Sequence, residues 1–132
     1  MSKAYKPGGY NSLSPYFVIT KAAKFMAMLE RIFHAEVLRK YDLPDGSIMH
    51  AEMRIDDSVI MLGDAGKGFK PNKLHIHIYV SDVDEVFYRA LDAGCIAIER
   101  PNQKENQPDR RGAFRDYGGN VWSVSTQITE SN

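Results

Sequence analysis

The clearest strand pattern in the sequence is the stretch Leu74-His75-Ile76-His77-Ile78-Tyr79-Val80. Its apolar residues alternate strictly with two histidines and a tyrosine, which is the period of a β-strand with one buried face. The residues that follow, Ser81 to Glu85, supply a capping hydroxyl and acidic side chains, and apolar positions then recur at helical spacing until Gly94. We therefore predict a strand followed by a helix, with the histidines and the tyrosine on the polar face of the strand.

Length and charge narrow the class of protein. The 132 residues suit about one domain with its own core, and 17 basic residues balance 17 acidic ones. This balance argues against nucleic-acid or membrane-surface binding, no apolar run is long enough to span a bilayer, and no signal-peptide core is recognisable. We expect a cytoplasmic protein without nucleic-acid or membrane partners, and a buried structural thiol at Cys95.

The same order of elements is predicted twice. The first half is expected to hold a strand over 12–19, a helix capped by Thr20 over 21–33, and strands over 35–43, 47–55 and 58–62. The second half is expected to hold a strand over 74–80, a helix over 82–93, and strands over 95–100, 111–116 and 121–126. This is an α+β fold of two tandem βαβββ modules, 12–63 and 73–127, in one domain, between a flexible N-terminal arm over 1–11 and a tail over 128–132.

The repeat has a register that equates positions of the two modules. Ser14 corresponds to His75 and Tyr16 to His77; in the hairpins Ala51 corresponds to Ala113 and Met61 to Ser123. Each helix covers one sheet face, and the other faces can close a barrel-like cavity within one chain or across two.

Strand alternation divides the hairpin residues between these two faces. In the first module the side chains expected under the helix are Met49, Ala51, Met53, Ile55, Ile60 and Leu62, and those facing the cavity are His50, Glu52, Arg54, Val59 and Met61. In the second module Phe114, Val121, Ser123 and Ser125 are expected to face the cavity, opposite Trp122. Polar groups on an enclosed face need partners, water or a ligand, so the candidate site is placed there.

Two segments carry a resemblance to a known family. Together with the tandem plan, residues 48–62 (IMHAEMRIDDSVIML) and 115–123 (RDYGGNVWS) resemble the vicinal oxygen chelate superfamily, most closely its glyoxalase/bleomycin-resistance/dioxygenase domains and the PhnB-like branch. The resemblance covers about Tyr10 to Gln127. It implies a homodimer with cavities at or near the subunit contact, and it leaves the activity unassigned because the fold hosts lyases, epimerases, dioxygenases and drug-sequestering proteins.

The resemblance also implies four metal-ligand positions, which here are Ser14, Met61, His75 and Ser123. Only His75 is a good ligand, whereas a divalent ion usually needs three or more protein donors. We therefore expect no cofactor and no metal at the usual site. A divalent metal held by His50, Glu52, His75 and His77 is the alternative.

The favoured hypothesis is a protein that binds a small molecule in a cavity of a homodimer. Its candidate ligand-binding residues are Tyr16, His50, Glu52, Arg54, His75, His77, Tyr79, Phe114 and Ser123. Catalysis stays open, with Glu52 and His77 as candidates; Glu52 and Arg54 form either a general base with its orienting cation or an ion pair that holds the sheet. The alternatives are a metal-dependent lyase or dioxygenase and a non-catalytic structural or interaction domain.

Overall fold

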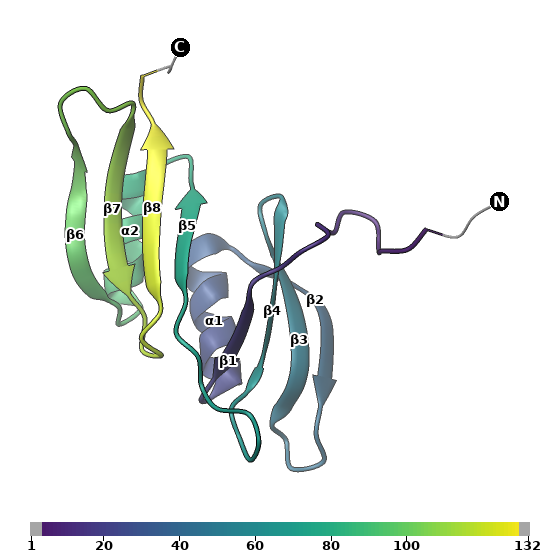
Figure 1. The fold of residues 1–132 in the computed structure, drawn as a ribbon. Coiled ribbons are helices and arrows are strands. Elements are labelled where there is room, and N and C mark those ends of the chain that lie inside the picture. Colours follow the sequence, from purple (N-terminus) through teal and green to yellow (C-terminus); the bar gives the residue numbers. More distant parts are fainter. Residues whose placement is uncertain (1–3, 130–132) are drawn as a thin grey trace. The chain divides into compact units, whose positions relative to one another are not determined.

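The computed structural model describes residues 4–129 and separates the chain into two compact units that meet at Asn72 and Lys73. Each unit holds one βαβββ module, so the predicted α+β fold of two such modules is confirmed (Figure 1). Residues 1–3 of the predicted arm and 130–132 of the predicted tail lie outside the described residues. No helix within residues 4–129 is long and apolar enough to cross a membrane.

The first module is a four-stranded sheet with one helix. Strand β1 pairs in parallel with β4, β4 pairs antiparallel with β3, and β3 pairs antiparallel with β2. The elements are β1 (Tyr16–Ile19), α1 (Ala22–Phe33), β2 (Glu36–Asp42), β3 (Ile48–Ile55) and β4 (Ser58–Asp64).

The second module repeats this arrangement. Its sheet has the order β5-β8-β7-β6, with β5 parallel to β8 and the other neighbours antiparallel. The elements are β5 (His75–Tyr79), α2 (Val83–Asp92), β6 (Ile96–Gln103), β7 (Asp109–Arg115) and β8 (Val121–Gln127). Strand β6 therefore continues through Pro101 to Gln103, beyond the end at residue 100 that the sequence predicted.

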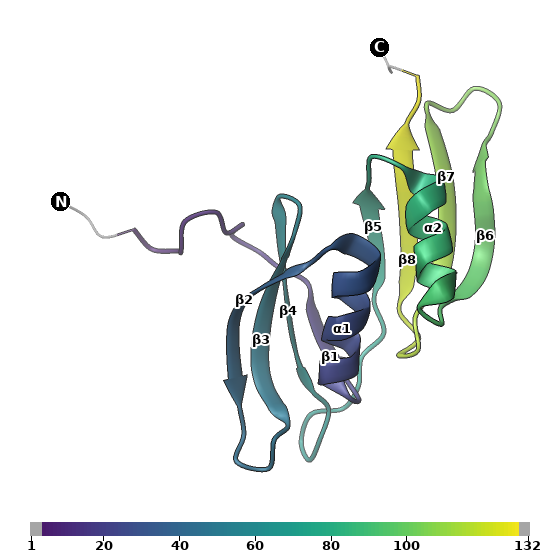
Figure 2. The same cartoon turned by 180° about the vertical axis from the view of Figure 1, so that it is seen from behind.

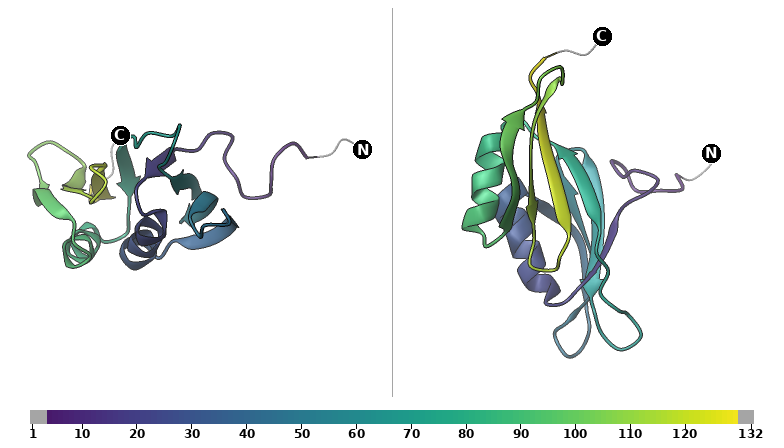
Figure 3. Two further views of the ribbon diagram at one scale, coloured as in Figure 1. Left: turned by 90° about the horizontal axis from the view of Figure 1, so that it is seen from below. Right: turned by 60° about the vertical axis from the view of Figure 1, so that its left-hand side comes forward.

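Each helix covers one face of its own sheet, as the view from behind in Figure 2 and the left view in Figure 3 show. The apolar stripe of α1 is buried together with the predicted inner residues of its sheet, because both lose their contact with water only by packing against each other. These inner residues are Ala51, Met53, Ile55, Ile60 and Leu62. Met49 was expected among them but is 54 % exposed, while its neighbour Ile48 is buried; the β2–β3 pairing is irregular there, which breaks the alternation.

The predicted cap of α1 is wrong. The helix begins after Lys21 rather than after Thr20, and Asp64 at the end of β4 satisfies its first amide. The two carboxylate oxygens of Asp64 accept hydrogen bonds from Ala22 N (2.8 Å) and Ile48 N (2.7 Å), so this side chain joins the starts of α1 and β3. In α2 the cap is the carboxylate of Asp82, which accepts from Glu85 N, and not the hydroxyl of Ser81.

The predicted face of Phe114 is also wrong. Phe114 lies directly opposite Trp122 in the β7–β8 ladder, and both side chains are fully buried in a module whose α2 packs on β7 and β8. The cause is the hairpin turn. Ile55 and Ser58 close a two-residue turn, whereas Asp116 N donates to Asn120 O across three residues. The extra residue moves β7 by one position, so that Ala113, and not Phe114, faces the same way as Ser123.

Candidate functional site

A chain of hydrogen bonds crosses the face of the first sheet that lies opposite α1. Tyr16 Oη lies 3.1 Å from His50 Nδ1, and His50 Nε2 lies 2.8 Å from the Glu52 carboxylate. The other carboxylate oxygen of Glu52 accepts a 2.6 Å hydrogen bond from the hydroxyl of Tyr10. Because β1, β4 and β3 are neighbours, and residues 50 and 52 share a strand face, the sheet itself aligns Tyr16, His50 and Glu52.

Arg39 supplies positive charge to this face from β2. It lies opposite Glu52 in the ladder, with Arg39 Nε 3.7 Å from the carboxylate, and its guanidinium carbon lies 5.6 Å from the centroid of the Tyr10 ring. The expected partner of Glu52 was Arg54, but its guanidinium lies beside Gly9 instead; a Cβ at Gly9 would come within 2.8 Å of it. The cation beside Glu52 is therefore Arg39.

Glu52 is an ionised and nearly inaccessible carboxylate, with 6 % of its surface exposed. Burial pushes the pKa of Glu52 upward, but the hydrogen bonds from Tyr10 and His50 and the electrostatic effects of His50 and Arg39 outweigh burial, so the pKa is lowered. Burial, and then the hydrogen bond to Glu52, raise the pKa of Tyr10, and burial raises the pKa of Tyr16. Both phenols therefore keep their protons at neutral pH.

Aromatic rings flank the imidazole on this face. The rings of Tyr16 and Tyr41 lie 5.6 Å and 6.4 Å from that of His50, and the two tyrosines remain 38 % and 50 % exposed. Two partly exposed rings beside a polar group form the kind of surface on which a planar ligand stacks.

A cavity of about 650 Å³ adjoins this face at the end of the first sheet. Tyr16 contributes to its wall, as do the first residues of β3, the last residues of β4 and the segment after β4. This volume is within the range of small-molecule sites.

The corresponding face of the second module holds separate hydrogen-bonded pairs instead of one connected network. His75 Nε2 lies 2.9 Å from Ser123 Oγ, and His77 Nε2 lies 3.0 Å from Ser125 Oγ. Tyr79 donates a 2.7 Å hydrogen bond to Asp109, which raises the pKa of Tyr79. The structure therefore brings His75 to Ser123, as expected for the same sheet face, beside a cavity of about 370 Å³ that Glu99 and Arg111 also line.

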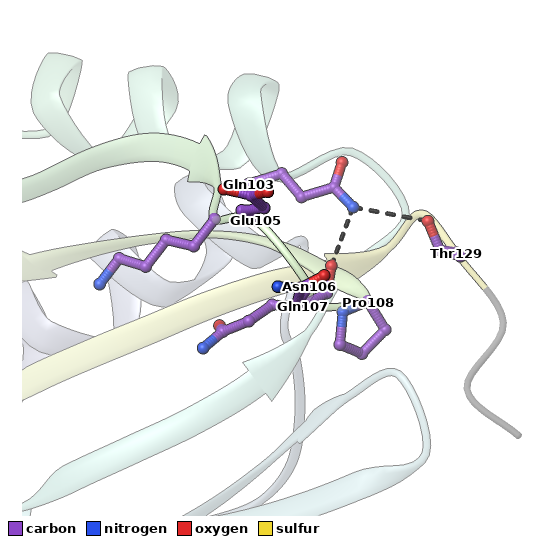
Figure 4. A pocket seen from close by; sticks show the side chains of 7 residues that line it. Gln103, Glu105, Asn106, Gln107, Pro108 and Thr129 are labelled. Carbon is purple, nitrogen blue, oxygen red and sulfur yellow. Dashed lines mark hydrogen bonds between the residues drawn. The ribbon is translucent and has the colours of Figure 1, made fainter.

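A further hollow of about 480 Å³ lies at the turn between β6 and β7 (Figure 4). The Gln103 side chain is hydrogen-bonded within it: Gln103 Nε2 donates to the backbone oxygen of Gln107 at 3.0 Å and to Thr129 Oγ1 at 3.5 Å. These contacts hold the turn to the end of β8, so we assign this hollow a structural role.

The residues at the superfamily's metal positions do not fit a divalent ion. Ser14, Met61 and Ser123 offer two neutral hydroxyls and a thioether, which are poor ligands, and one nitrogen of His75 is already hydrogen-bonded to Ser123. Of the alternative site, His50 and Glu52 lie in the first unit and His75 and His77 in the second. Within residues 4–129 no group of three or more histidine, cysteine or acidic side chains gathers around a metal position.

Three members of the site could not be found from the sequence. Tyr10 belongs to a segment with Pro7, Gly8 and Gly9 and no periodicity, and it reaches Glu52 through a contact across 42 residues. Arg39 and Tyr41 lie on an edge strand of mostly exposed residues, where alternation does not mark a face. The one available signal was their spacing of two, which places both on the same side of a strand.

The family profile described as Glyoxalase/Bleomycin resistance protein/Dioxygenase superfamily matches residues 16–124. The match spans most of both modules and includes Tyr16, His50, Glu52, His75 and His77. The chain therefore belongs to this superfamily, as the resemblance implied.

Curated relatives of similar length are uncharacterized mycobacterial proteins. The chain is 34 % identical over 134 residues to an uncharacterized protein of Mycobacterium bovis, a match that covers 92 % of this chain and 86 % of the relative. An uncharacterized protein of Mycobacterium tuberculosis matches at the same identity, with 92 % and 77 % covered.

Solved structures share the fold. TioX from Micromonospora sp. ML1 superposes with a TM-score of 0.75 at 22 % identity, over 89 % of this chain and 98 % of TioX. The fosfomycin resistance protein FosX from Listeria monocytogenes, in complex with Mn(II) and sulfate, gives a TM-score of 0.69 at 16 % identity, over 89 % and 90 %. At these identities the likeness establishes the architecture, and the activity has to be argued from the site.

Proposed function

We propose that this protein binds a small molecule on the open face of its first module, without the superfamily's usual metal. The observation that carries the proposal is the buried Glu52 carboxylate, held by Tyr10, His50 and Arg39 on the sheet face opposite α1. A buried charge is costly unless it is paired, and even a paired buried charge adds little net stability compared with apolar packing. The network instead fixes the orientation of His50 and Tyr16, which can meet a polar group of the ligand.

Glu52 serves better as an orienting group than as a general base. A base should have a pKa near the working pH, whereas the pKa of Glu52 is lowered and both of its oxygens already accept hydrogen bonds. In this proposal His50 and Tyr16 contact the ligand, and Tyr41 stacks against its planar part. His77 remains a candidate on the second module, together with His75, Tyr79 and Ser123.

The superfamily resemblance supports the rest of the proposal: membership of the PhnB-like branch, and a homodimer with the cavity at or near the subunit contact. Sedimentation velocity tests the dimer, since a single species of twice the chain mass is expected.

The alternative is a metal-dependent lyase or dioxygenase that uses His50, Glu52, His75 and His77. It requires donors from both modules at one ion. Elemental analysis of untagged protein, before and after loading with zinc, nickel, manganese and iron(II), separates the two hypotheses. We expect no stoichiometric metal. Near one ion per chain, lost in a His75→Ala/His77→Ala variant, would establish the alternative.

The binding proposal itself is tested by screening a small-molecule library with amide NMR spectra of the wild-type protein. Hits are expected to shift amides of the first module, and His50→Ala is expected to weaken their binding while the control variant His34→Ala, at an exposed histidine outside the site, does not. If neither His50→Ala nor Glu52→Gln changes the affinity of any hit, the proposal fails and an interaction domain becomes the better hypothesis.

A further inference from the structure

Exposed apolar side chains gather at the cavity of about 650 Å³ in the first module. Leu43, Met49 and Phe69 line it and are 42 %, 54 % and 68 % exposed. Large apolar groups scattered over a surface need no explanation, but several around one cavity leave an apolar area that a ligand can cover.

The wall of this cavity is fixed by backbone and carboxylate contacts. Gly66 and Phe69 exchange two backbone hydrogen bonds of 2.9 Å, and Ala65 N donates to Ile19 O. A Cβ at Gly63 would meet Met49 O at 2.7 Å and Tyr16 Oη at 3.2 Å, so the strand ends approach as closely as glycine permits. A preformed wall of this kind binds a ligand without a large cost of ordering.

The charged groups that line the cavity are two lysines, Lys21 and Lys67, and two aspartates, Asp45 and Asp64. Its two carboxylates are already used, since Asp64 accepts from Ala22 N and Ile48 N while Asp45 accepts from Ser47 N and Ser47 Oγ. Lys67 lines the same cavity, and no carboxylate of residues 4–129 lies within ion-pair distance of it. Its ammonium group can therefore receive an acidic group of a ligand.

We infer that this cavity binds the apolar part of a carboxylic acid whose carboxylate pairs with Lys67. Tyr16 lies in the cavity wall and also hydrogen-bonds His50, so it joins this compartment to the Glu52 network. The inference rests on the proposed function, because it names the class of ligand and where its apolar part binds.

The test compares 2-naphthoate with the uncharged 2-naphthylmethanol by amide NMR titration of the full chain. Naphthoate is expected to shift the amides of Gly63, Ala65 and Gly66 and to bind more tightly than the alcohol. Lys67→Gln should weaken naphthoate about fivefold and leave the alcohol unchanged, since one exposed charge-assisted contact is lost. The matched variant Lys70→Gln, in a lysine outside the cavity lining, should change neither affinity.

Phe69→Ala should weaken both compounds, because it removes apolar contact area without altering charge. Equal affinities of the acid and the alcohol, or no effect of Lys67→Gln, would overturn the inference, as would the absence of binding by either compound. Shifts confined to the amides around His50 and Glu52 would also overturn it while leaving the proposed function intact. Shifts confined to residues 73–127 would count against both.

Discussion

The open faces of the two modules have the same strand order but differ in their central residue, which is a carboxylate in the first module only. Tyr16 lies opposite Met61 in the first module as His77 lies opposite Ser123 in the second, so the predicted equivalence of these positions is confirmed. Glu52 lies opposite Met61, but Ala113 lies opposite Ser123. A methyl group therefore occupies the position of the central carboxylate, and the repeated backbone carries the acidic network once.

Each module nevertheless buries one carboxylate among the described residues. In the second module it is Asp116, 3 % exposed, which accepts from Gly118 N, Asn120 N and Asn120 Nδ2 and, at 2.9 Å, from Trp122 Nε1. All these partners lie within six residues and shape the β7–β8 turn. Glu52 is instead held by side chains from the arm, β2 and its own strand. A buried acid can therefore stabilise a local turn or organise a ligand site. Its hydrogen-bond partners distinguish the two roles, because they are local in the first case and come from separate segments in the second.

The largest effect is expected from removal of Asp116, the buried acid that shapes the β7–β8 turn. Asp116→Ala should lower the free energy of unfolding of the second module by about 3–5 kcal/mol, because several buried donors lose their acceptor. Urea unfolding followed by Trp122 fluorescence measures this. Asp57→Ala, in the exposed turn of the first hairpin, is the matched control and should cost less than about 0.5 kcal/mol. A cost below about 1 kcal/mol for Asp116→Ala would show that the network is dispensable.

Glu52→Gln tests the acid on the site side and should have a smaller effect. The glutamine amide keeps one acceptor oxygen but lacks the negative charge that Arg39 and His50 stabilise. We therefore expect the free energy of unfolding, measured in urea, to fall by about 1–3 kcal/mol. Glu36→Gln, at the exposed start of β2, is the control and should change little. An unchanged stability in Glu52→Gln would mean that Glu52 is not an ionised member of the network.

The stability difference between the wild type and Glu52→Gln should depend on pH. Because the folded pKa of Glu52 is lowered, its contribution is fully present above the pKa of an unfolded glutamate and is lost as pH falls through the folded pKa. Unfolding measured from neutral pH to about pH 3 should show the difference shrinking in acid. Asp84, whose pKa the Arg110 guanidinium lowers, affects both proteins equally and cancels. A difference that is constant with pH would contradict this assignment.

Tyr10→Phe should have the smallest effect, about 1 kcal/mol, because it removes one hydroxyl from a partly buried hydrogen bond. It also removes one cause that lowers the pKa of Glu52, so acid sensitivity should move to higher pH. Tyr5→Phe, at a side chain that is 86 % exposed, is the control. Identical behaviour of the two variants would show that the arm does not hold Glu52 in solution.

Local patterns predicted most of the fold and part of the site. Alternation placed Tyr16, His50 and Glu52 on one face because their own strands supply the period. The apolar run that begins at Cys95 predicted its buried thiol, whose pKa burial raises to about 12. Alternation failed for Phe114, where one extra turn residue shifts the strand, and for Met49, where pairing is irregular. It could not find Tyr10 or Arg39, since only tertiary contacts bring them to Glu52.

The proposed ligand site depends most on Glu52 being an ionised carboxylate held by Tyr10 and His50. The direct measurement is the titration of its side-chain carboxyl by carbon-detected NMR, assigned by comparison with Glu52→Gln. We expect a midpoint below the ordinary pKa of a glutamate, moving upward in Tyr10→Phe. A midpoint at or above the ordinary value, unchanged in Tyr10→Phe, would contradict the network on which the proposed site is built.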